Sequence, residues 1–238
     1  MLPATASRGA EPVMRIFVLS GQSNMAGRGG VHRRRWDGVV PPEGTPDPSI
    51  QRLSASLDWE EAREPLHADI DTAKTFGVGP GMVFARAVLP CLKEGTSGEG
   101  ARAGIGLGLV PCAVGGTAIR EWARGERLYE QMVCRARVAA RYGEIEAVLW
   151  YQGESDAESD ATAAAYRGNI KGLITNVRAD LGIPQLPFIQ VMALVPSYSH
   201  FGFVLPGFIH LFCICQIRMK LNCMNNELLS HLWYELLC

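Results

Sequence analysis

Four short apolar runs recur along most of the chain, separated by longer segments in which apolar residues have a helical spacing. The runs are rich in Val, Ile, Leu or Phe and are bounded by Gly or Pro, a pattern that indicates buried strands of a parallel sheet. They lie at residues 15–20, within 103–114, at 145–151 and at 187–194. The pattern therefore predicts a sheet built from these four strands.

Three segments between the runs predict helices. Residues 81–92 form the first, which we expect to stop near Pro90, and residues 127–142 form the second. Residues 161–181 form the third and end at Gly182, a residue type that commonly terminates helices. Strands that alternate with helices favour right-handed crossovers and a sheet covered on both faces. The prediction is an α/β fold, a three-layer sandwich with a central, mostly parallel sheet.

Two irregular segments and a distinct tail interrupt this alternation. Residues 27–75 are rich in Pro, Gly, Asp and Arg and predict a long loop, and residues 95–104 predict a surface turn. From Val195 onward the alternation of strands and helices is lost. The predicted organisation is a disordered leader, a single domain and an aberrant, apolar and Cys-rich tail, at residues 1–14, 15–194 and 195–238.

The tail holds one nearly continuous apolar stretch, residues 201–217. This stretch is at the short end for a membrane span, which needs about 20 residues. A membrane anchor is therefore an alternative that we do not favour. Cys213 and Cys215 have one residue between them and no matching pair follows, so we expect no zinc site.

Composition narrows the functional classes. Hydrophobic residues make up 47% and charged residues 20% of the chain, and the formal net charge is −1. This balance is typical of one globular domain and gives no reason to expect a nucleic-acid partner. The seven cysteines have no framework spacing, and the N-terminus lacks the apolar core of a signal peptide. We therefore expect a cytoplasmic protein.

Ser23 follows the first apolar run, within the segment Leu-Ser-Gly-Gln-Ser-Asn-Met-Ala-Gly at 19–27. In open α/β sheets, ligands bind beyond the carboxyl ends of the strands. A serine at that place is exposed, lies near a helix N-terminus and has backbone N–H groups beside it that can stabilise an oxyanion. The simpler alternative is a serine that only caps the helix.

Two further strand ends carry polar or flexible residues. The second run ends in Gly115 and Gly116, where a missing side chain lets a backbone N–H approach a ligand, although a plain strand-to-loop turn uses the same residue type. The third run ends in polar residues, of which Gln152 offers an amide donor and Glu154 and Asp156 offer carboxylates. Because three strand ends meet at one edge of the sheet, we expect these groups to converge on Ser23.

These blocks resemble those of the SGNH (GDSL-like) hydrolase superfamily, in particular its carbohydrate acetylesterase branch, which includes sialate O-acetylesterase-like proteins. Gly-Gln-Ser-Asn-Met-Ala-Gly (21–27) is similar to the nucleophile block of that branch, and Trp-Tyr-Gln-Gly-Glu-Ser (150–155) to its third block. Phe-Gly-Val-Gly-Pro-Gly-Met (76–82) and Pro-Cys-Ala-Val-Gly-Gly (111–116) also match, most closely in plant members. The resemblance spans about residues 16–193 and implies an SGNH/flavodoxin-like sandwich.

The resemblance also implies a role for each block. Ser23 Oγ would attack an ester carbonyl, and the oxyanion would be bound by the backbone N–H of Ser23, by that of Gly116 or Gly115, and by the Gln152 amide. Each such donor typically contributes about 3–4 kcal/mol. Glu154 stands where some relatives have the carboxylate that orients the catalytic His. The substrates would be acetyl esters of sugars, either small molecules or polysaccharides, and no metal or cofactor would be needed.

The last block of the family, Asp-x-x-His, has no match in this sequence. His200, His210 and His231 follow the third block, but none has an acid three residues before it. His32 and His67 lie at the wrong end of the chain for the family order. Loss of one member of a catalytic triad typically costs about 10⁴–10⁶ in rate. We therefore expect impaired activity and an esterase domain whose C-terminal part is truncated or replaced.

The leading prediction is thus a serine hydrolase scaffold of the carbohydrate O-acetylesterase type, with low or no activity. A non-catalytic carbohydrate-binding module is one alternative. A non-functional splice product is another, because the abrupt change of composition in the tail is typical of translated intron or frame-shifted sequence. Among the tail histidines, His200 is closest to the fourth run and could serve as a substitute base, although we favour the simpler interpretation of a surface histidine. The sequence does not indicate an oligomeric state.

Overall fold

The computed structural model describes residues 14–94 and 106–191. The predicted leader up to residue 13, the whole of the predicted 95–104 turn and the tail lie outside the described residues, so the predictions made for them stay predictions. The same holds for the three tail histidines and for the apolar stretch at 201–217.

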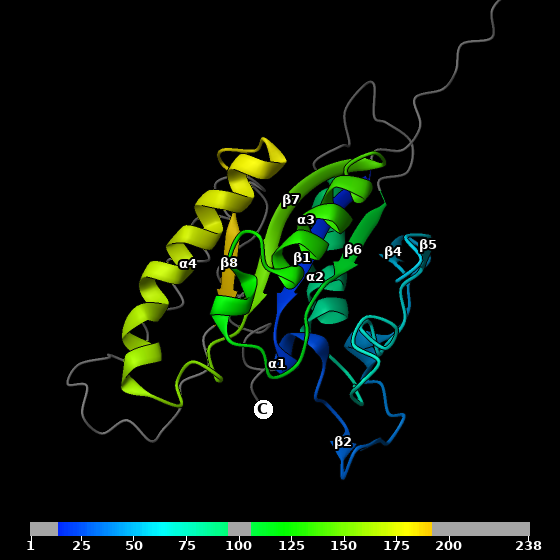
Figure 1. The fold of residues 1–238 in the computed structure, drawn as a ribbon. Coiled ribbons are helices and arrows are strands. Elements are labelled where there is room, and N and C mark those ends of the chain that lie inside the picture. The colour runs from blue at the N-terminus through cyan, green and yellow to red at the C-terminus, as the bar shows by residue number, and fades with distance from the viewer. Residues whose placement is uncertain (1–13, 95–105, 192–238) are drawn as a thin grey trace, which may run out of the picture.

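A six-stranded sheet with the strand order β5-β4-β6-β1-β7-β8 forms the centre of the described fold (Figure 1). Five neighbouring strands run parallel, and only the edge strand β5 is antiparallel to its partner β4. The strands are β1 (Met14–Gly21), β4 (Ile50–Leu53), β5 (Trp59–Glu61), β6 (Leu107–Pro111), β7 (Gly143–Tyr151) and β8 (Phe188–Val191). The α/β fold with a mostly parallel sheet is confirmed.

Helices cover both faces of this sheet. In Figure 1, α2 lies on one face of the sheet and α3 and α4 lie on the other. Leu19 and Phe17 of β1 belong to the core that includes α2, whereas Ile16 and Val18 belong to the core that includes α3 and α4. This alternation with a period of two is what a strand with two buried faces requires. The helices are α1 (Ser23–Ala26), α2 (Pro80–Glu94), α3 (Arg127–Ala139) and α4 (Asp160–Leu181), with short 3₁₀ helices η1 (Pro42–Gly44) and η2 (Ile119–Trp122).

The predicted stop of the first long helix at Pro90 is wrong, because α2 continues to Glu94. A proline removes one backbone hydrogen bond but does not by itself prevent another turn. Cys91 and Leu92 follow it and are buried in the core, which holds the last turn against the sheet. The predicted end of α4 is confirmed, since Gly182 caps this helix in the left-handed conformation at φ 68°.

The predicted long loop at 27–75 contains more structure than its composition indicates. It supplies β4 and β5 to the main sheet and a separate hairpin of β2 (Val31–His32) and β3 (Arg35–Trp36). β4 has the sequence Ile-Gln-Arg-Leu and β5 is Trp-Glu-Glu. Such short strands with polar residues lack the apolar run by which the other four were recognised.

The strand order reverses at β1. β6 lies on one side of β1, and the next strand in the chain, β7, lies on the other. In open α/β sheets the crevice at such a switch point is the usual place for a ligand.

Within residues 14–94 and 106–191, no helix is both long and apolar enough to span a bilayer.

Candidate active site

Gly21, the last residue of β1, brings the two neighbouring strand ends onto the nucleophile segment. Its carbonyl accepts a hydrogen bond from Val114 N–H at 3.0 Å, and the next residue, Gln22, donates its N–H to the Tyr151 carbonyl at 2.9 Å. Gly21 has φ 129°, and a Cβ there would lie 2.1 Å from the Tyr151 oxygen. Only glycine allows this approach, so the turn that presents Ser23 depends on it.

Ser23 is the first residue of α1 and is half-buried. As a first helical residue, its backbone N–H has no partner within the helix. Neither this N–H nor the Ser23 Oγ makes a hydrogen bond with any residue that the structure describes. The serine therefore combines a free hydroxyl with a free backbone donor at the switch point of the sheet.

The loop after β6 lies directly against Ser23. A Cβ built on Gly115 would be 3.5 Å from Ser23 Cβ, which is ordinary contact distance. The Gly115 N–H is already in use, because it donates to Asp71 Oδ2 at 3.0 Å. Gly116 is exposed, has φ 69°, and donates its N–H to none of the described residues. Of the two predicted glycine donors, the geometry leaves the one on Gly116 free.

The loop after β7 has a different character. Gln152 is 4% exposed, and its Nε2 lies 2.6 Å from Asp156 Oδ2, 3.0 Å from the Thr117 carbonyl and 3.2 Å from Gln22 Oε1. Asp156 Oδ2 also accepts the Ile119 N–H at 2.8 Å. An amide group has two hydrogens, so three acceptors already saturate it. Gln152 would bind an oxyanion only by releasing one of them, and its predicted role stays a prediction.

Glu154 lies on the same loop and faces α1. Its Oε1 accepts a hydrogen bond from Asn24 Nδ2 at 2.5 Å, whereas its Oε2 is buried and has no partner among the described residues. Burial and the nearby Glu154 charge raise the pKa of Tyr151, the last residue of β7. A buried carboxylate oxygen without a donor is costly. The loop thus offers an acceptor for an N–H group that the described residues do not supply.

Neither histidine of the described region serves Ser23. His32 is exposed in the β2–β3 hairpin, and His67 is completely buried. Burial lowers the pKa of His67 to about 3, so its ring is uncharged at neutral pH. No hydrogen bond joins either ring to Ser23 in the part of the chain that the structure describes.

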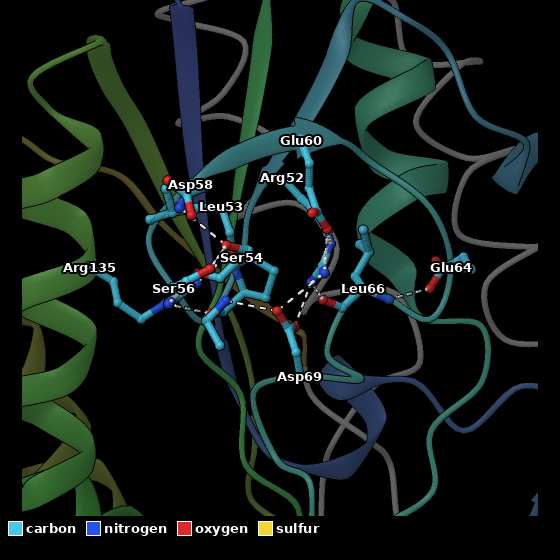
Figure 2. A network of polar contacts seen from close by, with 12 residues as sticks. Arg52, Leu53, Ser54, Ser56, Asp58, Glu60, Glu64, Leu66, Asp69 and Arg135 are labelled. Carbon is cyan, nitrogen blue, oxygen red and sulfur yellow. Dashed lines mark hydrogen bonds and ion pairs between the residues drawn. The ribbon is translucent and has the colours of Figure 1, made fainter.

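A network of polar contacts fixes the segment that leads to Asp71 (Figure 2). Arg52 of β4 binds both carboxylate oxygens of Asp69, at 2.6 and 3.2 Å, and the Leu66 carbonyl at 2.9 Å. Asp69 also accepts the Ala55 N–H at 2.8 Å. Burial alone would raise the pKa of Asp69, but the hydrogen bonds from Arg52 and Ala55 outweigh it and lower that pKa. The turn before Asp71 is therefore anchored to β4.

Arg135 extends this network from α3 to two strand ends (Figure 2). Its guanidinium donates to the carbonyls of Leu53 at 2.7 Å, Ser54 at 2.9 Å and Pro111 at 3.0 Å. Leu53 ends β4 and Pro111 ends β6. Arg135 thus joins α3 to the ends of β4 and β6. The end of β6 is the point at which the loop that carries Gly115 begins.

Several residues of the site carry no signal in the sequence. Asp71 and Lys74 contact the site from a segment without a recognisable motif, whereas Asn24, which binds Glu154, lies in the nucleophile block but has no role predicted from the sequence. Asp71 and Lys74 lie in the segment predicted to be irregular, and only the folded chain brings them to Gly115. Among the described residues, no group of three or more His, Cys, Asp or Glu side chains is placed to hold a metal ion.

Comparisons with known proteins identify relatives of this chain. Residues 13–201 match the family model of carbohydrate esterases described as sialic acid-specific acetylesterase (SASA). A protein of Arabidopsis thaliana named as a probable carbohydrate esterase is 56% identical over 187 residues, which cover 76% of this chain and 69% of the relative.

Solved structures are also similar. An X-ray structure of an Arabidopsis thaliana protein has 55% identity and a TM-score of 0.67, over 75% of this chain and 73% of that one. The crystal structure of NanS has 19% identity and a TM-score of 0.59, over 75% of this chain and 67% of that one, and supports the fold alone.

Proposed function

The chain belongs to the carbohydrate esterase family described as sialic acid-specific acetylesterase, and on this premise we propose that it is a serine hydrolase scaffold that binds acetyl esters of sugars and cleaves them at Ser23. The observation that carries the proposal is the Ser23 hydroxyl beside two backbone donors, its own N–H and that of Gly116, all three without a partner among the described residues. Attack on an acetyl carbonyl creates an oxyanion, which such donors stabilise by about 3–4 kcal/mol each.

Proton transfer is the weak step of the proposed reaction. Ser23 Oγ has no base among the described residues, and a serine hydroxyl without a base is a poor nucleophile at neutral pH. In a relative with a complete triad, a histidine would take the proton and a carboxylate would hold the histidine. The unpartnered Glu154 Oε2 supports Glu154 as that carboxylate. We infer that the chain hydrolyses its substrate with a kcat about 10⁴-fold below that of an enzyme with a complete triad.

Hydrolysis of p-nitrophenyl acetate by the full chain and by Ser23→Ala tests the proposal. The wild type should exceed Ser23→Ala, and both should keep the same thermal midpoint because the change is small and half-exposed. Equal rates would overturn Ser23 as nucleophile. Acetylated xylan fragments separate the sugar-ester proposal from a binding module. Acetate release that requires Ser23 supports the esterase. Binding of the fragments with equal affinity by the wild type and Ser23→Ala, without acetate release, favours a carbohydrate-binding module.

A further inference from the structure

Asp71 and Lys74 grip the backbone of one residue of the Ser23 site, Gly115. Asp71 is 8% exposed and accepts the Gly115 N–H at 3.0 Å. Lys74 donates its ammonium to the Gly115 carbonyl. The two side chains also approach each other, with 3.9 Å between Lys74 Nζ and Asp71 Oδ2. A single short turn thus binds both polar groups of Gly115.

This grip lies next to the nucleophile. The point where Gly115 would carry a Cβ is 3.1 Å from Lys74 Nζ and 3.5 Å from Ser23 Cβ. The corresponding point on Gly116 is 3.3 Å from Lys74 Nζ. Lys74, Ser23 and the two glycines therefore form one compact group.

The planarity of the peptide bond gives the grip a consequence for Gly116. The Gly115 carbonyl and the Gly116 N–H belong to the same trans peptide unit, so they point in opposite directions and turn together. Lys74 fixes the direction of the carbonyl and therefore also that of the Gly116 N–H. A cation on the carbonyl further polarises the unit and makes its N–H a stronger donor. Asp71 meanwhile occupies the neighbouring Gly115 N–H.

We propose that Asp71 and Lys74 are positioning residues of the oxyanion hole, which select Gly116 rather than Gly115 as the donor and hold its N–H in place. The inference rests on the proposed function and adds two residues to its site. The anchoring of Asp69 by Arg52 and Ala55 supports it, because a grip from a rigid turn holds a flexible Gly-Gly loop better than a mobile one (Figure 2).

Two pairs of variants separate the grip from a general effect on folding. Lys74→Met and Asp71→Ala remove the donor and the acceptor, whereas Lys74→Arg and Asp71→Asn keep them. Lys171→Met on the outer face of α4 is the matched control for Lys74→Met, because both lysines are exposed, and Asp58→Ala in the β4–β5 turn controls for the loss of a carboxylate at an exposed position. All variants are made in the full chain, and their thermal midpoints are compared with that of the wild type.

Two measurements are then made. In Ser23-dependent hydrolysis of p-nitrophenyl acetate, Lys74→Met and Asp71→Ala should lower kcat by about tenfold with KM unchanged, as expected for a displaced transition-state donor. Lys74→Arg, Asp71→Asn and both controls should keep most of the activity. In backbone amide exchange followed by NMR, the Gly115 N–H should exchange faster in Asp71→Ala than in Asp71→Asn or the wild type.

The outcomes for the two proposals are distinct. If Lys74→Met matches Lys171→Met in kcat, or if Lys74→Arg is as impaired as Lys74→Met, the grip has no positioning role. If the wild type does not exceed Ser23→Ala, the proposed function fails, and the exchange measurement alone decides on the grip. Faster exchange of Gly115 in Asp71→Ala then supports it, and unchanged exchange overturns it.

Discussion

The two loops that flank Ser23 offer opposite kinds of hydrogen-bonding group. The loop after β6 presents a donor, because the Gly115 N–H is bound to Asp71 and the Gly116 N–H is free. The loop after β7 presents acceptors, because the Gln152 amide nitrogen is saturated while Gln152 Oε1 and Glu154 Oε2 are buried without partners among the described residues. The donor side suits a developing oxyanion, and the acceptor side suits the N–H of a base.

This difference separates what the described residues can complete from what they cannot. The proposed oxyanion hole needs only positioned donors, and the β6 side offers the Gly116 N–H. General-base catalysis needs a group that takes the serine proton, and the β7 side has only the carboxylate that could orient such a group. In the proposed reaction, the described residues therefore supply a donor for the oxyanion but no base for the proton.

The largest effect is expected from Gly21→Ala, because both flanking strand ends are hydrogen-bonded to the chain at this end of β1. A Cβ at φ 129° and 2.1 Å from the Tyr151 oxygen forces the strands apart. We expect a loss of about 4 kcal/mol in the free energy of unfolding. Thermal denaturation should show a midpoint lower by about 8–16 °C.

Gly172→Ala is the matched control for that change. Gly172 lies on the exposed side of α4, and nothing lies within 4 Å of its missing Cβ. There the same substitution should stabilise by about 0.5–1 kcal/mol. An equal effect of the two substitutions would contradict the account of Gly21.

The pH dependence of the free energy of unfolding tests the segment around Glu64, which leads to Asp71 and Lys74. Burial raises the pKa of Glu64 from 4.5 to about 7, although its two oxygens accept the N–H groups of Leu66 and Gly79. The folded chain therefore binds this proton more tightly than the unfolded chain. Stability from Glu64 is full below about pH 4.5 and falls as the pH rises to about 7, by at most about 3 kcal/mol.

Glu64→Gln should remove this dependence. The free energy of unfolding of the variant relative to the wild type, from urea denaturation, should rise between pH 4.5 and 7 and then level off. His67 has the opposite sign, because its pKa is lowered to about 3 and its contribution is lost as the pH falls. Its effect is common to both chains and cancels in the difference. A difference that is constant with pH would exclude a raised pKa of Glu64.

The acceptor side is tested by supplying the missing base from solution. Imidazole should increase the Ser23-dependent hydrolysis of p-nitrophenyl acetate beyond its effect on Ser23→Ala, because Glu154 Oε2 can accept its N–H. Glu154→Gln should reduce this rescue by about tenfold, the value of one hydrogen bond to a charged acceptor. Glu158→Gln, an exposed neighbour, should leave it unchanged. Equal rescue in both variants would remove Glu154 from the site.

The sequence predicts the donor side of the site less completely than the sheet that carries it. Apolar runs revealed β1, β6, β7 and the described part of β8, because strands buried on both faces have no polar positions. β4 and β5 escaped, since both are short and carry charged residues such as Arg52 and Glu60, which pair with each other. Asp71 and Lys74 also escaped, because their role arises from a contact with Gly115, more than 40 positions away along the chain.

The most direct test of the central claim is whether Ser23 forms a tetrahedral adduct at the donor side. A simple alkylboronic acid mimics the acetyl carbonyl under attack, and its boron becomes tetrahedral when a serine oxygen binds it. Boron NMR of the full chain should show a tetrahedral signal that disappears in Ser23→Ala and weakens in Lys74→Met. A signal that persists unchanged in Ser23→Ala, or no tetrahedral signal in the wild type, would contradict Ser23 as the positioned nucleophile.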